Sequence, residues 1–348
     1  MLNKAIHLGL ALLSALPAWA ACNEDVPANE VGATERIVQM IEESVRAEAK
    51  KGAARRDAHA KAHGCVKAQF HVLDKLPEEL KVGIFREVRT YPAWIRYSNG
   101  SGTVQDDSVG DARGMAIKLM GVKGSESGTQ DFVMINHPVF IVRNAADYVE
   151  FQKAVSEGNP IKFFFPGLNP FDFRLHELGI ALALRGLKVA NPLDSRYWSM
   201  TPYLFGDTTS MKFSARACGP TSSFIETDSP DFLRDNMRNH LAQGEACFDF
   251  MVQLRKRPQL MPIEDPTLEW SEKDSPFIPV ARITISPQAF DSPKQMAFCE
   301  NLSFTPWHAL PEHRPLGGIN RVRKAVYETI SRVRHELNGN PRREPTSF

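Results

Sequence analysis

The sequence has few of the features that mark membrane, nucleic-acid or metal-cluster proteins. After residue 20 it contains no apolar run long enough to cross a membrane. Its net charge of +1 over 348 residues gives no electrostatic reason to expect nucleic acid or an anionic surface as a partner. It has no Cys-x-x-Cys spacing, which argues against a thiolate metal cluster. We therefore expect no nucleic-acid partner and no membrane span.

Only the first twenty residues differ in character from the rest. Lys4 precedes an apolar run over residues 5–16, and small residues end the segment at Ala20. This order predicts a signal peptide over residues 1–20, cleaved after Ala20, and hence a periplasmic or secreted protein. A lipoprotein anchored at Cys22 is the alternative, although Trp19 is unfavourable three positions before that cysteine.

Cysteine is scarce, and all five cysteines follow the expected cleavage site. An oxidising compartment permits disulfides, but an odd number leaves at least one thiol without an intramolecular partner. The spacing does not determine which cysteines pair. The five are Cys22, Cys65, Cys218, Cys247 and Cys299.

Patterns typical of strands dominate the rest of the chain. Period-two alternation, as in residues 282–285, and bounding turn residues predict seven or eight strands. No linker-like composition divides residues 21–348, so we expect one α+β domain on an antiparallel sheet closed into a barrel. The expected strands span residues 66–73, 93–99, 115–122, 131–142, 211–217, 248–254 and 280–285. The expected helices span residues 34–51, with Thr34 as N-cap, and 145–156, 175–187, 230–242 and 320–336.

The last expected helix carries an unusual polar stripe. Arg323, Tyr327, Ile330 and Arg334 recur at helical spacing, so they share one face. A guanidinium beside a phenol favours the phenolate, which is a suitable ligand for ferric haem iron. The second arginine suits a haem propionate, because guanidinium and carboxylate pair in a fork. The alternative is an amphipathic surface helix whose arginine side chains lie over a buried tyrosine.

A second group of polar residues lies near the start of the expected sheet. His59 precedes the first strand, Arg96 and Ser98 share one face of the second, and Asp111 and Asn136 follow. A neutral imidazole can take a proton from a peroxide and return it to the leaving oxygen. An amide can stabilise the charge that develops on that oxygen, and a hydroxyl can fix the imidazole tautomer.

In order and spacing, these residues resemble the haem core of catalases and of the smaller catalase-related peroxidases, over roughly residues 55–334. Arg323-x-x-x-Tyr327 resembles the haem-ligand motif of that family. The resemblance implies an antiparallel β-barrel of about eight strands with surrounding helices, holding ferric haem b. It implies Tyr327 as the axial ligand of the iron, and His59 as the distal acid–base group.

The resemblance also assigns roles to the other residues. Asn136 is expected to bind the peroxide, Ser98 to orient the imidazole, and Asp111 to lie toward the substrate channel. The cofactor-binding residues that it implies are Arg56, Arg96 and Arg334 at the propionates, Arg323 at the phenolate, and Phe140.

Several positions depart from the family's pattern. Ala58 replaces a bulkier aliphatic residue before the histidine, His137 stands where larger relatives have threonine, and Ile141 replaces an aromatic residue. We also expect the C-terminal helical region of full-size catalases to be absent. These changes imply a roomier or differently shaped pocket, which favours organic hydroperoxides over fast dismutation of hydrogen peroxide. Trp94 and Phe140 fit a cavity wall and the core equally well.

The leading hypothesis is a haem hydroperoxidase that uses a peroxide and a small-molecule electron donor, as a monomer or homodimer. A true catalase and a hydroperoxide isomerase or dehydratase resembling allene oxide synthases are the enzymatic alternatives. A haem or lipid carrier is the non-enzymatic one, although mere binding needs neither His59 nor Asn136. Zinc at His59 and His63 is disfavoured, because Ala60 stands where zinc proteases need glutamate. Gly317-Gly318 is interpreted as a turn, because the P-loop lysine is missing.

Overall fold

The computed structural model describes residues 22, 24–220, 222 and 228–348. The expected signal peptide, residues 1–20, lies outside them, so it and the single domain over residues 21–348 stay predictions. Among the described residues, no helix is both long and apolar enough to cross a membrane.

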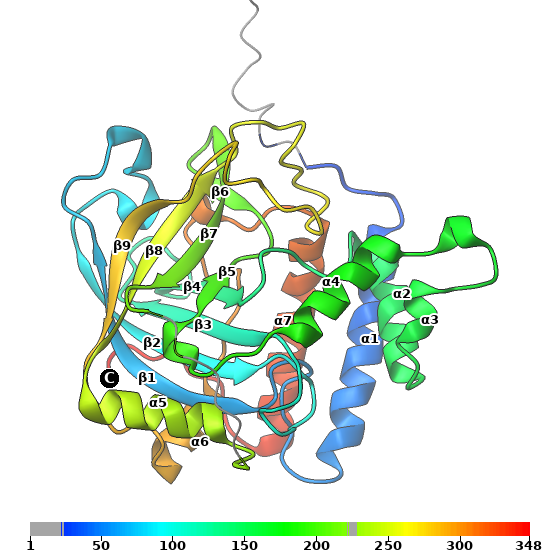
Figure 1. Cartoon of the computed structure of the whole chain (residues 1–348), viewed down its shortest axis with the longest axis horizontal. Helices are drawn as coiled ribbons and strands as arrows, with labels where there is room; N and C mark the ends of the chain where they lie inside the picture. The colour runs from blue at the N-terminus through cyan, green and yellow to red at the C-terminus, as the bar shows by residue number, and fades with distance from the viewer. Residues whose placement is uncertain (1–21, 23, 221, 223–227) are drawn as a thin grey trace, which may run out of the picture.

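An antiparallel β-sheet forms the centre of the molecule (Figure 1). Eight strands close into a ring in the order β5-β4-β3-β2-β1-β9-β8-β7, because β5 pairs with both β4 and β7. The short strand β6 pairs with β7 outside this ring. The expected antiparallel barrel of about eight strands is therefore confirmed. The strands are β1 (Ala62–Val72), β2 (Thr90–Asn99), β3 (Arg113–Met120), β4 (Thr129–Ile135), β5 (Arg196–Trp198), β6 (Tyr203–Phe205), β7 (Thr209–Ala217), β8 (Ala246–Leu254) and β9 (Ile278–Ile285).

The interior of the barrel is a packed aromatic core. The ring centroids of Phe132 and Phe250 lie 4.6 Å apart, and those of Phe70 and Phe250 lie 5.1 Å apart. Because side chains alternate across a strand, the other half of each strand faces outward. Across β2, β3 and β4 the outward residues form three rows in register, namely Ser98–Gly114–Ile135, Arg96–Ala116–Val133 and Trp94–Lys118–Asp131.

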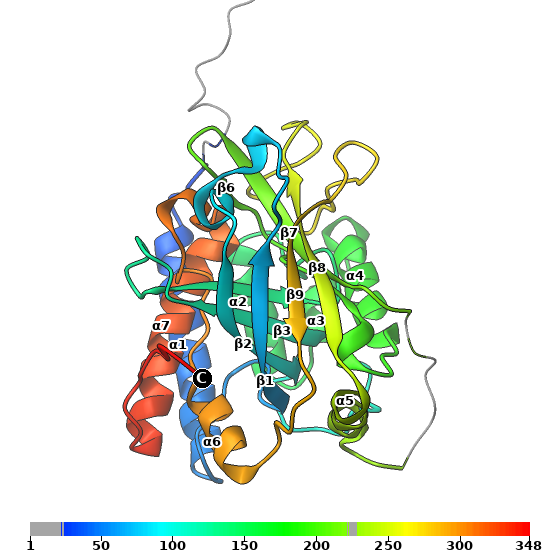
Figure 2. The same ribbon diagram turned by 90° about the vertical axis from the view of Figure 1, so that its left-hand side faces the viewer.

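Two long helices run side by side along one side of the barrel (Figure 2). α1 (Glu30–Ala49) and α7 (Gly318–Asn338) bury a shared apolar cluster that includes Ile37, Val326 and Val333. The other helices are α2 (Ala145–Ser156), α3 (Ile161–Phe164), α4 (Leu175–Gly186), α5 (Phe232–Gln243) and α6 (Pro293–Asn301), and the single turns of 3₁₀-helix are η2 (Glu78–Leu80), η3 (Gly83–Phe85), η4 (Pro170–Asp172), η5 (Pro192–Asp194) and η6 (Pro311–His313).

Two local expectations were wrong. Thr34 is not the N-cap of the first helix: the cap is Asn29, and the Thr34 hydroxyl donates within the helix to the Glu30 carbonyl at 2.8 Å. The strand expected over residues 131–142 ends at Ile135. Pro138 has no N–H to donate to a neighbouring strand, so the apolar residues after it belong to a loop.

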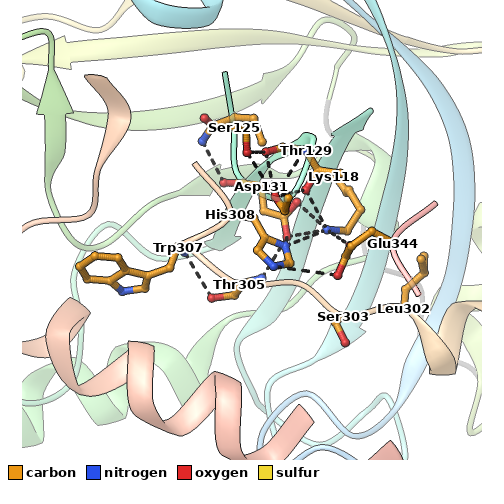
Figure 3. A network of polar contacts seen from close by, with 12 residues as sticks. Lys118, Ser125, Thr129, Asp131, Leu302, Ser303, Thr305, Trp307, His308 and Glu344 are labelled. Carbon is orange, nitrogen blue, oxygen red and sulfur yellow. Dashed lines mark hydrogen bonds and ion pairs between the residues drawn. The ribbon is translucent and has the colours of Figure 1, made fainter. Parts of the chain in front are cut away.

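A buried ion cluster fastens the loop before α7 and the C-terminal segment to the outer face of the barrel (Figure 3). The fully buried Lys118 ammonium lies 2.8 Å from Asp131 Oδ1 and 2.8 Å from Glu344 Oε2. The Thr305 N–H donates to Asp131 Oδ2 at 3.0 Å. A buried cation is tolerated when it is paired in this way. The cluster fixes the position of Phe304, whose ring lies 5.6 Å from the same ammonium.

The structure contains two disulfides, which the sequence alone did not assign. Cys65–Cys299 joins β1 to α6 across 234 residues, and Cys218–Cys247 joins the end of β7 to β8. Within the described residues, Cys22 is not in a disulfide.

Candidate active site

A cavity lies between the outer face of β2–β4 and helix α7. The small residues Gly114 and Ala116 lie at the centre of the outward rows, so the strand side is hollowed. All four residues of the predicted stripe line the helix side, which confirms that they share one face. They are Arg323, Tyr327, Ile330 and Arg334.

His59 lies on the strand side of this cavity in a strained backbone conformation. Its φ of 60° is left-handed, which is rare for a residue with a side chain. Its N–H donates to the Gly100 carbonyl at 2.9 Å, and Arg96 donates to its carbonyl at 2.8 Å. The imidazole Nδ1 lies 3.0 Å from Ser98 Oγ. A Cβ at Gly114 would lie 2.6 Å from this nitrogen, so the ring needs glycine there.

The environment of His59 favours the neutral imidazole. Burial, followed by the charge of Arg96, lowers the pKa of His59 to about 4. Ser98 occupies Nδ1, so Nε2 is the ring nitrogen that this contact leaves free. At neutral pH the ring is therefore an uncharged base with one nitrogen available.

Tyr327 and Arg323 form a pair on the helix side. The Arg323 Nη2 donates to the Tyr327 hydroxyl at 3.2 Å, and its Nη1 donates to Thr201 at 3.2 Å and to Asn320 at 3.1 Å. The guanidinium is thus fixed on three sides. It places a permanent positive charge beside the phenol oxygen of Tyr327.

Asn136 is buried directly after β4, and it is not among the residues that line the cavity. Its Oδ1 accepts from the Arg113 N–H at 2.7 Å. Because that N–H can only donate, the contact fixes which end of the amide is oxygen. The other end of the amide, Nδ2, is therefore the donor.

Three arginines converge at one end of the cavity around a single carboxylate. Glu300, at the end of α6, lies 2.9 Å from Arg56, 3.4 Å from Arg334 and 3.9 Å from Arg96. Although burial raises it, these three charges hold the pKa of Glu300 below its usual value. The Glu300 backbone carbonyl also accepts from Arg334 at 2.6 Å.

This cluster is short of negative charge. Three guanidinium groups and one carboxylate leave two positive charges unbalanced. Burial, followed by the charge of Arg56, lowers the pKa of Arg334 to about 9. The buried Nε atoms of Arg96 and Arg334 have no hydrogen-bond partner among the described residues. Asp57 in the cavity wall and the exposed Arg55 add one charge of each sign, so the excess remains.

Haem fits this set of residues. Its two propionates would balance the two positive charges, its apolar ring suits the aliphatic walls, and a phenol is available to the iron. The aspartate expected near a substrate channel also lines the cavity, where Asp111 Oδ2 accepts from Gly100 N–H at 2.8 Å. Phe140, Ala58 and Ile141 line it as well.

Some expected residues lie elsewhere. Trp94 packs outside the cavity against Phe298 at 4.7 Å, and His137 is not part of the lining. His63 is fully buried with Nδ1 3.8 Å from Asp107, which is a structural position. In the described ranges, no group of three histidine, cysteine or acidic residues could hold a metal ion.

Several cavity residues were not found from the sequence. Glu300 belongs to α6, a helix that the sequence patterns did not predict. Tyr148 and Phe151 lie three residues apart on a helix that was predicted, and that spacing was a usable signal for a wall. Met200 and Phe304 come from loops and had no such signal.

Known proteins that are similar to this chain in sequence or fold are described as catalases. Residues 34–177 match the family model described as Catalase. Catalase of Mus musculus is 26% identical over 270 residues, covering 70% of this chain and 50% of that protein. Catalase-A of Dictyostelium discoideum is 26% identical over 291 residues, covering 75% and 55%. A solved bacterial catalase matches the fold with a TM-score of 0.64 at 18% identity, covering 99% of this chain and 70% of that one. The chain thus spans about half the length of the curated relatives it matches.

The arginine cluster makes a stability prediction. In the haem-free protein, Glu300→Gln should lower the free energy of unfolding by about 1–3 kcal/mol, because three buried or partly buried cations lose the carboxylate that they share. Urea unfolding followed by circular dichroism measures this change. Adding haem should reduce the loss, because propionates would supply the missing charge. Glu328→Gln, an exposed position on α7, is the control and should change little. Equal losses in the two variants would contradict the charge argument.

Proposed function

We propose that this chain is a haem enzyme of the catalase superfamily and that it degrades peroxides. In more detail, we propose a hydroperoxidase that reduces organic hydroperoxides or hydrogen peroxide with electrons from a small-molecule donor. The proposed cofactor is ferric haem b, held by Tyr327 at the iron, by Arg56, Arg96 and Arg334 at the propionates, and by contact with Phe140.

One arrangement carries this proposal. The His59–Ser98 pair on the strand side and the Tyr327–Arg323 pair on the helix side line the same cavity, and an arginine cluster short of negative charge lies at its end. A haem carrier needs the second pair and the arginines. It does not need a neutral imidazole oriented by a hydroxyl, whereas peroxide cleavage does.

The chain's own residues then divide the work of peroxide reduction. When bound, ferric haem would supply the electron transfer that breaks the O–O bond. His59 Nε2 takes the proton from the attacking peroxide oxygen and returns it to the leaving oxygen, which departs as water or an alcohol. Ser98 holds the ring through Nδ1. Asn136, next to the lining residue Ile135, would have to reach the cavity for its Nδ2 to donate to oxygen as negative charge develops there. The donor then supplies two electrons and two protons, and the second peroxide oxygen leaves as water.

The size of the peroxide separates two candidate activities. Ala58 and Ile141 both line the cavity. Ala58 is smaller than the aliphatic residue of the family's pattern, and Ile141 replaces an aromatic residue of that pattern. Both differences favour an organic hydroperoxide as substrate. The relatives named above are described as catalases, which favours dismutation of hydrogen peroxide as the second candidate. The two disulfides support the proposal that the protein works in the periplasm or outside the cell, because cytosolic thiols are kept reduced.

Activity assays distinguish these candidates. A hydroperoxidase should oxidise a phenolic donor at the expense of cumene hydroperoxide, with little oxygen evolved from hydrogen peroxide. Rapid oxygen evolution without a donor would instead establish a catalase. Consumption of a fatty-acid hydroperoxide with neither oxygen nor donor oxidation would indicate an isomerase or dehydratase. A protein that binds haem and shows none of these reactions would contradict the proposed function.

Tyr327→Phe tests the proximal assignment. Without the phenol oxygen the iron loses its proposed ligand, so the absorption spectrum of the ferric haem should shift or disappear. Tyr148→Phe is a matched control, because it removes another phenol from the same cavity lining but not the proposed ligand, so it should leave the spectrum unchanged. An unchanged spectrum in Tyr327→Phe would rule out this ligand.

His59→Ala tests the distal assignment and its titration. The variant should keep haem but lose peroxide turnover by about a hundredfold or more, the usual contribution of a positioned base.

Because the pKa of His59 is lowered to about 4 in the folded protein, the wild-type base stays neutral down to that pH. Turnover should therefore persist through pH 6.5 and fall only as the pH approaches 4. A loss of turnover centred near pH 6.5, or full activity in the variant, would refute the assignment. His71→Ala, at a partly exposed position that is not part of the cavity lining, is the control.

A further inference from the structure

Exposed apolar side chains are concentrated in one segment of the molecule. Seven of the sixteen large apolar residues that are exposed in the described chain fall within residues 155–182, less than a tenth of the sequence. Scattered exposed apolar residues need no explanation, but a gathering of this kind marks an interaction surface. The seven, called here the apolar arm, are Val155, Ile161, Phe165, Leu168, Phe171, Leu175 and Leu182.

The tip of the apolar arm is almost completely open to water. Leu168 is 99% exposed and Phe171 is 96% exposed, in the loop between α3 and α4 that projects from the right of the molecule in Figure 1. The loop is nevertheless ordered by its own contacts. The Asn169 side chain accepts from the Phe171 N–H at 3.2 Å and donates to Asp172 at 3.1 Å. A defined loop therefore presents two large apolar side chains outward.

The helices that carry the apolar arm also build a wall of the proposed active-site cavity. Phe151 of α2 and Leu184 of α4 line that cavity, while Val155 and Leu182 of the same helices face solvent. Phe151 contacts Phe163 of α3 with ring centroids 5.3 Å apart. The exposed surface and the cavity are thus two sides of one helical layer.

Exposed cations flank the apolar arm, although the whole chain is nearly neutral. Lys153 precedes the arm and Arg185 and Lys188 follow it, whereas Lys162 and two carboxylates lie within its range. One carboxylate, Glu157, is paired with Lys162 at 3.0 Å. The exposed cations are Lys153, Lys162, Arg185 and Lys188, and the exposed carboxylates are Glu157 and Asp172.

These features fit a lipid surface better than a second protein. A stable protein interface buries on the order of 1,200–2,000 Å² in total and needs a broad complementary face, whereas this tip is a narrow projecting loop. A bilayer adapts to a convex tip, accepts leucine and phenylalanine below the headgroups, and attracts flanking cations when its lipids are anionic.

We propose that the apolar arm docks the protein onto an anionic lipid bilayer, with Leu168 and Phe171 inserted. Docking would hold the helical layer that lines the cavity against the source of hydroperoxides formed on acyl chains. This substrate class rests on the proposed function, whereas the docking itself does not. The surface binds from one side, and the described residues contain no membrane span.

Vesicle flotation of the purified, haem-loaded full chain tests the proposal. Vesicles of phosphatidylethanolamine and phosphatidylglycerol should carry the wild-type protein upward. Leu168→Ser with Phe171→Ser should reduce the bound fraction, by about tenfold for each side chain that fully inserts. Both positions are almost fully exposed, so the fold should be unaffected, as circular dichroism can verify. Leu260→Ser, an exposed leucine in another loop, is the matched control and should float as the wild type does.

The outcomes separate this proposal from the proposed function. Absence of flotation, or equal flotation of the double variant, would overturn the docking proposal. So would a wild-type dimer in solution that the double variant dissociates and that does not float, because the occupant would then be a second copy. The double variant should keep wild-type turnover of water-soluble cumene hydroperoxide and lose turnover of phospholipid hydroperoxide held in vesicles. Flotation without any peroxide turnover would leave the docking established and refute only the enzymatic function.

Discussion

The closed barrel has one packed interior, and this constraint decides where chemistry can occur. Phenylalanine side chains from β1, β4, β7 and β8 fill the centre, so no cofactor can enter it. Strand alternation sends Arg96 and Ser98 to the outer face together, and it places Gly114 and Ala116 beside them. Those two small residues leave a hollow on an otherwise filled wall. Helix α7 covers the hollow, and the space between them becomes the cavity.

The second determinant is the charge at the end of that cavity. Arg56, Arg96 and Arg334 come from a loop, from β2 and from α7, and they would repel one another without Glu300. The preceding residue, Cys299, is covalently joined to Cys65 of β1, and the Gln295 side chain donates to the Cys65 carbonyl at 2.8 Å. The position of the shared carboxylate is therefore tied to the barrel itself. An anionic ligand meets a cluster whose charges are already held in place, so little reorganisation is needed on binding.

The features that could be predicted from the sequence depend on residues that are close together in the chain. The stripe on α7 and the shared face of Arg96 and Ser98 follow from the helical and strand periods, and both were confirmed. Glu300 could not be predicted, because its contact with Arg56 spans 244 residues and its helix had no clear pattern. The three-residue strands β5 and β6 are too short to show alternation, although β5 closes the ring. The roles themselves came from resemblance to a family, and no local rule supplied them.

The backbone of His59 bears on whether this site is built for turnover. A left-handed conformation at a residue with a side chain costs on the order of 1–3 kcal/mol and persists only where the surroundings impose it. Here Gly100, Arg96 and Gly114, from three parts of the chain, impose it together. Their combined effect is to direct Nδ1 at Ser98 and leave Nε2 available. A binding protein gains nothing from this arrangement, because an apolar residue in a relaxed conformation would cover a haem face equally well. The strain is therefore better explained by a base that must meet a proton at a fixed point.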